Sequence, residues 1–252
     1  MHVRRGRGAA AFAALALAVA GVSTSSRAAI LSENFDEPGG FFGNTGIAPN
    51  LPSVPVVAGW SVQNRSTTIG THSWFSGSAS SPNFGPQAGT GYAAVDVNST
   101  TGQATISNWL FSPVISFNSG DRVSFFTRTA TPVQFPDRLQ LRLSTNGSST
   151  NVGTTDTSFG DFSTVMLDIN PNQTFSAYPT SWTEFTATMP TNGTGRIAFR
   201  YFVTNGGPSG DNGNYIGIDS LNITAVPEPA SALALVLAGA SALVARRRRS
   251  TN

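Results

Sequence analysis

The sequence predicts an all-β fold, a two-sheet antiparallel sandwich, for residues 30–224. Three observations lead to this prediction. Apolar and polar residues alternate over short stretches, clusters of Gly, Asn, Ser and Pro separate these stretches, and no helical period recurs between them. Successive side chains of a β-strand point to opposite faces of the sheet. Alternation of this kind therefore places one face of each strand against a core.

Seven segments each contain a predicted strand: 93–99, 121–129, 137–145, 163–170, 182–189, 195–204 and 215–224. The alternation is clearest within the third segment, where Leu139, Leu141 and Leu143 share one face. The residues between them are polar or charged and point to the other face. Asn-Gly, Ser-Gly and Gly-Gly pairs between the segments are typical of hairpin and Greek-key connections.

Composition narrows the class of protein and of partner. The 252 residues are 39% hydrophobic, which is enough for one sizeable core, and the chain has no cysteine for disulfide or thiol chemistry. All 15 cations are arginines, and eight of them lie in the first 29 residues or after residue 245. Residues 30–224 therefore carry 7 arginines against 12 acids. This negative balance argues against binding to nucleic acid.

Residues 1–28 have the three-part pattern of a secretory signal peptide. Arg4, Arg5 and Arg7 precede an apolar run over residues 9–22, and small residues stand at the −3 and −1 positions of a cleavage site after residue 28. A transmembrane anchor is the alternative, but this run is short for a bilayer. We therefore expect a cleaved signal peptide.

Residues 225–252 have the pattern of a second targeting signal. Pro227, Glu228 and Pro229 resist helix formation, because proline fixes φ and lacks an N–H. An apolar run over 233–245 follows, and it is short for a bilayer, which needs about 20 residues. The chain then carries a cluster of cations that would stay on the cytoplasmic side of the membrane: Arg246, Arg247, Arg248 and Arg249.

This tail resembles the PEP-CTERM sorting signal of Gram-negative bacteria. The resemblance implies that the chain crosses the inner membrane and that an exosortase recognises Pro227, Glu228 and Pro229. That enzyme would remove the hydrophobic helix and pass the protein outward. A plain single-pass anchor is the alternative interpretation of the tail.

The central region resembles the choice-of-anchor J domains, which are relatives of the cleaved-adhesin and MAM-type jelly rolls. The resemblance covers nearly all of residues 30–224 and rests on "SENFDE", "SNWLFSP", "FPDRLQLRLST", "RYFVT" and "YIGIDSLNI", in this order. It implies that the sandwich is a jelly roll. It also implies attachment to the cell surface through a variable anchoring signal, of which the tail is one kind.

The central region offers little for catalysis. His72 is its one histidine, no Gly-x-Ser-x-Gly elbow occurs, and zinc chemistry lacks ligands. A glycosidase would need a pair of carboxylates, and no acidic pair stands on a recognisable catalytic strand. We therefore expect His72 to be a surface or loop histidine and the protein not to be an enzyme, with a hydrolase as a remote alternative.

Three carboxylates suggest a structural calcium ion. Related jelly rolls pair their first and last strands, which would bring Glu33 and Asp36 close to Asp219. Such a cluster would repel itself, and Ca²⁺ prefers oxygen ligands of this kind. The alternative is that these carboxylates cap turns or pair with arginines. Asp211 and Asn214 form a second, weaker candidate site.

Two further sets of residues are structural or ligand-binding candidates. Arg128 and Asp137 lie on consecutive strands, where a bidentate pair would fix the strand register, and Arg200 has the same two interpretations. Aromatic rings could instead stack on sugars, and the candidates are Trp60, Trp74, Trp109 and Trp182. Trp74 lies in a Ser- and Gly-rich segment and is the expected exposed platform. We expect Trp60 and Trp109 to lie in the core.

Together these patterns predict a non-enzymatic, exported protein of the cell surface or extracellular matrix, acting in adhesion or in the organisation of exopolysaccharide and biofilm. Its expected partners are the secretion machinery, the exosortase, and exopolysaccharide or matrix proteins. A carbohydrate-binding module that uses loop aromatics is the alternative function.

Overall fold

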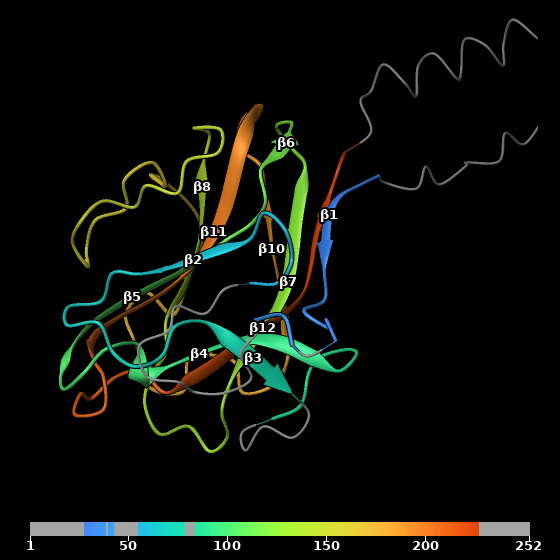
Figure 1. Ribbon diagram of the computed structural model, residues 1–252. Coiled ribbons are helices and arrows are strands. Elements are labelled where there is room, and N and C mark those ends of the chain that lie inside the picture. The colour runs from blue at the N-terminus through green and yellow to red at the C-terminus, as the bar shows by residue number, and fades with distance from the viewer. Residues whose placement is uncertain (1–27, 39, 43–54, 79–83, 227–252) are drawn as a thin grey trace, which may run out of the picture.

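The computed structural model describes residues 28–38, 40–42, 55–78 and 84–226. Within these ranges twelve strands form two six-stranded antiparallel sheets, and one short 3₁₀ turn is present. The sheets pack face to face around a common core (Figure 1). The predicted all-β, two-sheet antiparallel sandwich is thus confirmed.

The first sheet has the strand order β10-β7-β12-β4-β3, and β1 also pairs with β12. Its strands are β1 (Ala29–Glu33), β3 (Phe75–Ser78), β4 (Gly91–Asp96), β7 (Arg122–Thr129), β10 (Thr183–Thr188) and β12 (Tyr215–Thr224). One half of β12 pairs with β4 and the other with β1. The register of β12 against β7 shifts after Asp219, where Ser220 adopts a φ of 51°. The predicted pairing of the first and last strands is therefore confirmed.

The second sheet has the order β2-β5-β11-β8-β9, and β6 also pairs with β11. Its strands are β2 (Ser61–Asn64), β5 (Ala104–Phe111), β6 (Ile115–Phe117), β8 (Leu139–Ser144), β9 (Thr164–Ile169) and β11 (Gly193–Gly206). The 3₁₀ turn η1 (Val97–Ser99) follows β4 and precedes β5.

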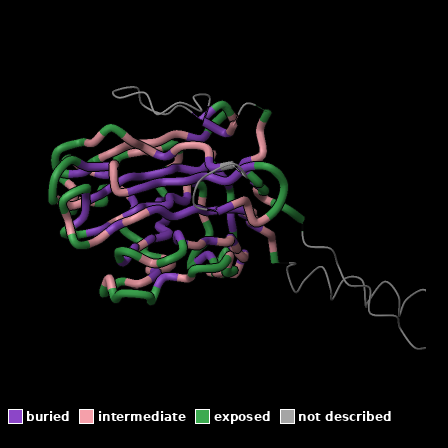
Figure 2. The backbone as a smooth tube through the Cα atoms, turned by 90° about the horizontal axis from the view of Figure 1, so that it is seen from below, coloured by how far each residue is buried: buried purple, intermediate pink, exposed green. Residues whose placement is uncertain are grey.

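Burial follows the alternation of the sequence in β7 but not in β8. Every second residue of β7 is buried, as the pattern predicts, whereas all six residues of β8 are buried. The segment 145–163 explains this difference, because it covers the outer face of the second sheet. Its Val152 and Phe162 pack against Trp109, Phe111 and Ala198 in a separate small core. Figure 2 shows the buried stretches running along the strands, with the exposed residues gathered in the loops.

The chain enters and leaves the sandwich at the same end. The N–H of Ala225 donates to the carbonyl oxygen of Ala28 over 2.9 Å, and Ala29 pairs with Thr224. The start of β1 and the end of β12 accordingly lie side by side (Figure 1). We call this the terminal end of the sandwich.

The opposite end, which we call the loop end, is formed by residues 97–103, 130–138, 170–182 and 207–214. These segments adjoin the ends of β4, β7, β9 and β11 that are remote from Thr224, because Tyr215, the first residue of β12, pairs with Asp96. The 10 residues of β12 separate the two ends by about 33 Å at the rise of an extended strand.

The predicted signal peptide and C-terminal sorting signal lie almost entirely outside the described residues. Of the signal peptide 1–28 only Ala28 is described, and of the tail 225–252 only Ala225 and Val226. The sorting motif, the hydrophobic helix and the arginine cluster therefore remain predictions. In the part of the chain that the structure describes, no helix has the length and apolar character needed to cross a membrane.

Candidate functional site

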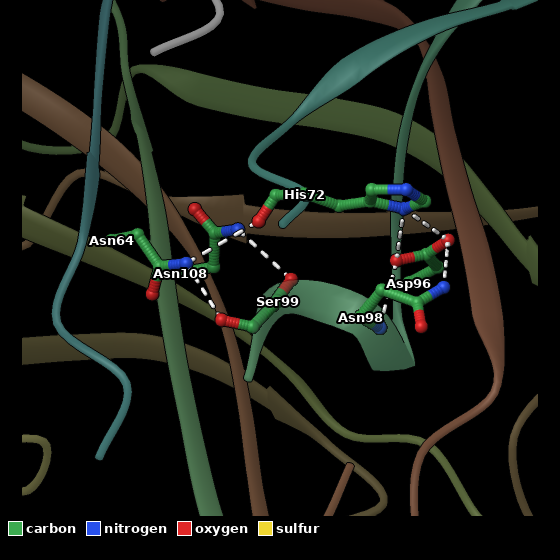
Figure 3. A network of polar contacts seen from close by, with 6 residues as sticks. All are labelled: Asn64, His72, Asp96, Asn98, Ser99 and Asn108. Carbon is green, nitrogen blue, oxygen red and sulfur yellow. Dashed lines mark hydrogen bonds and ion pairs between the residues drawn. The ribbon is translucent and has the colours of Figure 1, made fainter. Parts of the chain in front are cut away.

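A polar network at the loop end joins the segment before β3 to β4 and η1 (Figure 3). The Nδ1 atom of His72 lies 2.9 and 2.8 Å from the two carboxylate oxygens of Asp96. The same carboxylate accepts a hydrogen bond of 2.9 Å from the backbone N–H of Asn98 and one of 3.2 Å from its side-chain amide, which caps η1. Asp96 therefore holds the histidine ring and the turn in one arrangement.

Two asparagines extend this network to the second sheet. Asn64 of β2 donates to the backbone oxygens of His72 and Ser99, over 3.3 and 2.7 Å. Asn108 of β5 donates to the Ser99 hydroxyl over 2.9 Å and accepts from the hydroxyl of Ser73 over 3.3 Å. The network thus ties the edges of both sheets together at the loop end.

The His72–Asp96 pair supports the fold, and among the residues that the structure describes it is not joined to a nucleophile. A triad needs a nucleophile whose proton the imidazole can accept. Within the described residues, no hydroxyl is hydrogen-bonded to the ring of His72, whose polar contacts are those with Asp96. His72 does lie in a loop, as predicted, but only 11% of its side chain is exposed. The Asp-x-Asn of residues 96–98 signals a capped turn in the sequence, whereas nothing there signals the histidine partner 24 residues away.

A second buried network surrounds Asp137, which has no exposed surface. Its carboxylate accepts hydrogen bonds from the hydroxyls of Thr129 and Tyr201, over 2.5 and 2.6 Å, and from the backbone N–H of Asn214 over 2.8 Å. Burial raises the pKa of Asp137, and these three hydrogen bonds partly oppose that shift. The carboxylate therefore links β7, β11 and the segment 207–214.

The predicted pair between Arg128 and Asp137 is wrong. Arg128 donates to the carbonyl oxygens of Thr129 and Thr180, over 3.3 and 2.5 Å, and its guanidinium lies 4.4 Å from the centre of the Phe84 ring. The alternation along β7 is the reason, because Thr129 points inward to the carboxylate while Arg128 points outward. The residue after Asp137, Arg138, forms an ion pair with Asp168 instead, with an N–O distance of 2.6 Å.

Arg200 is buried rather than presented to a ligand. It is 1% exposed, donates to the Ser107 hydroxyl over 3.0 Å and to the backbone oxygen of Asp156, and lies 3.8 Å from the centre of the Phe202 ring. Burial, together with the nearby positive charge of Arg142, lowers the pKa of Arg200 to about 9. This environment agrees with a structural role for Arg200 rather than with a role in binding a ligand.

Of the three carboxylates predicted to bind calcium, Asp36 lies close enough to Glu33 and to Asp219 for its charge to add to the rise in pKa that burial causes in both. Asp36 accepts backbone N–H bonds from Thr90 and Gly91 over 2.6 and 2.7 Å, and Glu33 accepts one from Phe35 over 2.9 Å. Asp219 accepts from three backbone N–H groups, those of Gln87, Ala88 and Ser220.

These contacts correspond to the alternative in which the carboxylates organise turns. No group of three or more His, Cys, Asp or Glu side chains within the described residues is arranged to hold a metal ion. The arrangement of Glu33, Asp36 and Asp219 therefore does not fit a ready-made calcium site, and calcium binding stays a prediction. The same holds for Asp211, whose carboxylate accepts from the Asn205 amide over 2.8 Å.

Asp219 makes the stability of the fold depend on pH. Burial raises its pKa to about 6, and the charge of Asp36 adds to the shift. The folded state thus binds this proton more tightly than the unfolded state, so the contribution is full below the unfolded pKa and is lost as the pH rises through about 6. We expect the free energy of unfolding to fall by about 1 kcal/mol from this group between pH 5 and 7.

Urea unfolding at a series of pH values measures this effect. The variant Asp219→Asn should lose that part of the pH dependence, whereas Asp211→Asn, at an exposed position, should retain it. Burial also raises the pKa of Glu33, so some dependence of the same sign should persist in both variants. An unchanged pH profile in Asp219→Asn would contradict the assignment.

The aromatic residues correct one prediction and support another. Trp74 is 0% exposed and belongs to the main core, so the prediction that it is an exposed sugar platform is wrong. β3 begins directly after it, at Phe75, so that the indole is carried inward although its neighbours are serines and glycines. Trp60 and Trp109 are buried, as predicted. Trp182 is half-buried, and its indole N–H donates to the carbonyl oxygen of Gly85 over 3.0 Å.

Comparisons with known proteins find similarity in structure only. No protein-family model matches the chain, and no curated protein matches it either. Among solved structures, the K1 cleaved adhesin domain of Lys-gingipain from Porphyromonas gingivalis W83 is 19% identical, with a TM-score of 0.49 over 78% of this chain and 98% of that one.

Carbohydrate-binding modules also occur among these structures. TmCBM61, solved with β-1,4-galactotriose, is 13% identical, with a TM-score of 0.38 over 66% of this chain and 88% of that one. The CBM22-1 xylan-binding domain of Xyn10C from Paenibacillus barcinonensis is 12% identical, with a TM-score of 0.37 over 81% of this chain and 97% of that one. The structures to which this chain is similar thus include adhesin domains and carbohydrate-binding modules.

Proposed function

We propose that this chain is an exported, non-enzymatic protein of the cell surface or extracellular matrix, delivered by an exosortase that acts at Pro227, Glu228 and Pro229. The observation that carries the proposal is the meeting of Ala28 and Ala225 at the terminal end. Ala28 and Ala225, to which the two targeting segments are joined in the sequence, therefore lie at one end of the sandwich. Cleavage of either segment would leave the strands and their core intact, and the loop end would remain free to meet a partner.

The chemistry of the described residues agrees with a role in adhesion. Two of the side chains that could do acid–base work are engaged with the protein itself: His72 with Asp96, and Asp137 with three internal donors. A choice-of-anchor J identity and a Gram-negative source belong to this proposal. The protein would organise a matrix by binding, without turning over a substrate.

Expression of the full chain in a Gram-negative host, with and without an exosortase, tests the sorting step. We expect the wild-type protein to leave the membrane fraction only in the host with the enzyme, with a mass that shows loss of the tail. Replacing Pro227, Glu228 and Pro229 together by alanine should leave the protein in the membrane fraction, whereas Pro208→Ala, in an exposed loop, should not. Release of the triple variant at the wild-type rate would overturn this assignment.

Carbohydrate binding is the second candidate function. The observation that favours it is the exposure of two phenylalanine rings at the loop end, Phe135 at 39% and Phe175 at 60%. Exposed aromatic rings are costly to leave in water and are frequent at binding surfaces. This candidate is compatible with the first, because a matrix protein can act by holding a polysaccharide.

A further inference from the structure

We propose that the loop end is the ligand-binding surface and that its ligand is a neutral polysaccharide. The proposal rests on the second candidate function and assigns it a surface, a chemical class of ligand and a set of contact residues. It replaces Trp74, which the core encloses, by residues that no sequence motif indicates.

The two exposed rings lie on loops that are joined to each other. The side-chain amide of Asn170 donates to the backbone oxygen of Asp137 over 2.9 Å, which connects the loop of Phe175 to the loop of Phe135. The backbone N–H of Gly213 donates to the carbonyl oxygen of Pro136 over 2.8 Å, which adds the segment 207–214. The loops that carry the two rings are therefore held to each other and to the segment 207–214 at the same end of the sandwich.

Amide and carboxylate groups are fixed by hydrogen bonds at the same end of the sandwich. Gln173 donates from its side-chain amide to the Thr204 hydroxyl over 2.9 Å and accepts from the N–H of the same residue over 2.7 Å. The side chain of Asn205 accepts from that of Gln103 and donates to the carboxylate of Asp211 over 2.8 Å. Amides both donate and accept hydrogen bonds and a carboxylate accepts them, which suits the hydroxyls of a sugar.

The backbone holds two of these side chains in an uncommon conformation. Gln173 has a φ of 49° and Asn205 a φ of 54°, in the left-handed region that non-glycine residues seldom occupy. Asn170 and Ser176, in the loop of Phe175, have φ values of 55° and 60°. Strain of this kind persists where the surrounding contacts over-determine the backbone, and it is enriched at ligand-binding sites.

The charge of the surface selects a neutral ligand. Within residues 97–103, 130–138, 170–182 and 207–214 the sequence places one cation, Arg138. Its guanidinium is already engaged with the carboxylate of Asp168, through bonds of 2.9 and 2.6 Å. Asp211, by contrast, is exposed. Arg128 borders this surface, and its guanidinium donates to Thr180 and lies over the Phe84 ring. An anionic polymer would therefore meet only cations that are already engaged with protein groups, whereas the hydroxyls of a neutral polymer would meet amides, a carboxylate and aromatic faces.

Polysaccharide binding by the full chain in a non-glycosidic detergent tests this proposal. The probes are xylan and β-1,4-galactan as neutral polymers and alginate as the anionic one, with binding measured by affinity electrophoresis. We expect retardation by a neutral polymer and none by alginate. Phe175→Ala should weaken binding by about tenfold, as loss of one aromatic contact predicts, and Phe135→Ala in the same direction.

Phe159→Ala is the matched control, because Phe159 is 44% exposed but lies in segment 145–163, outside the loop end. It should bind like the wild type, and thermal unfolding should show all three variants folded. If the wild type binds a neutral polymer and the Phe135→Ala/Phe175→Ala double variant binds it equally well, the assigned surface is wrong. Retardation by alginate alone would overturn the neutral class. Retardation by none of the three would remove the carbohydrate-binding function itself.

Discussion

Replacing Trp74 by alanine is expected to lower the free energy of unfolding by about 3–5 kcal/mol. The side chain is fully enclosed in the main core, so its removal takes away apolar contacts and leaves a cavity. Chemical denaturation of the purified variant measures this loss. A role in binding sugars predicts the opposite, namely unchanged stability together with weaker polysaccharide binding.

The conservative variant Trp74→Phe sharpens this test. The Nε1 atom of Trp74 is buried and has no hydrogen-bond partner among the described residues, so the indole leaves a polar group unsatisfied there. Phenylalanine removes that group and keeps most of the apolar volume, so its cost should be well below that of alanine. Equal losses for the two variants would contradict a packing role.

Replacing Asp137 by alanine is expected to lower the free energy of unfolding by about 3 kcal/mol, because three hydrogen-bond donors lose their acceptor in a buried place. Asp137→Asn should cost less. Its amide nitrogen can donate to the Thr129 hydroxyl, which can itself donate to the carbonyl oxygen of Tyr215, now 3.1 Å away. The remaining oxygen can still accept from Tyr201 and Asn214.

A surface ion pair provides the control for Asp137. Arg122 and Glu184 lie 3.7 Å apart, and both side chains are more than 40% exposed. Glu184→Ala should therefore change the free energy of unfolding by less than about 1 kcal/mol. Comparable losses for Asp137→Ala and Glu184→Ala would show that the Asp137 network contributes little. Because Asn214 belongs to the network, Asp137→Ala should also loosen the loop end and weaken polysaccharide binding.

The fold could be predicted because it depends on local patterns. Alternation along β7 and β8 and the turn pairs between segments indicate strands without knowledge of their partners. The same patterns do not show that segment 145–163 buries the outer face of β8, since Val152 and Phe162 look like ordinary loop residues in the sequence.

The candidate site depends on contacts between distant residues, and sequence reasoning reached it only in part. The Arg128–Asp137 prediction was wrong because neighbouring residues of β7 point to opposite faces of the sheet. Thr129, and not Arg128, therefore faces the carboxylate. The prediction for Trp74 was wrong for a related reason. Its serine and glycine neighbours suggest an exposed loop, but the residue stands directly before β3 and its indole points into the core. Phe135 and Phe175 stand out only once the loops are assembled, because nothing around them in the sequence distinguishes an exposed ring from a buried one.

The most direct test of whether this protein binds a polysaccharide or hydrolyses it is to measure both activities in the same sample. The full chain is incubated with xylan or β-1,4-galactan, and bound protein and newly formed reducing ends are measured together over time. We expect saturable binding with no increase in reducing ends. Release of reducing ends that Asp96→Asn or His72→Asn abolishes, in variants shown to be folded, would contradict it and make the protein a hydrolase.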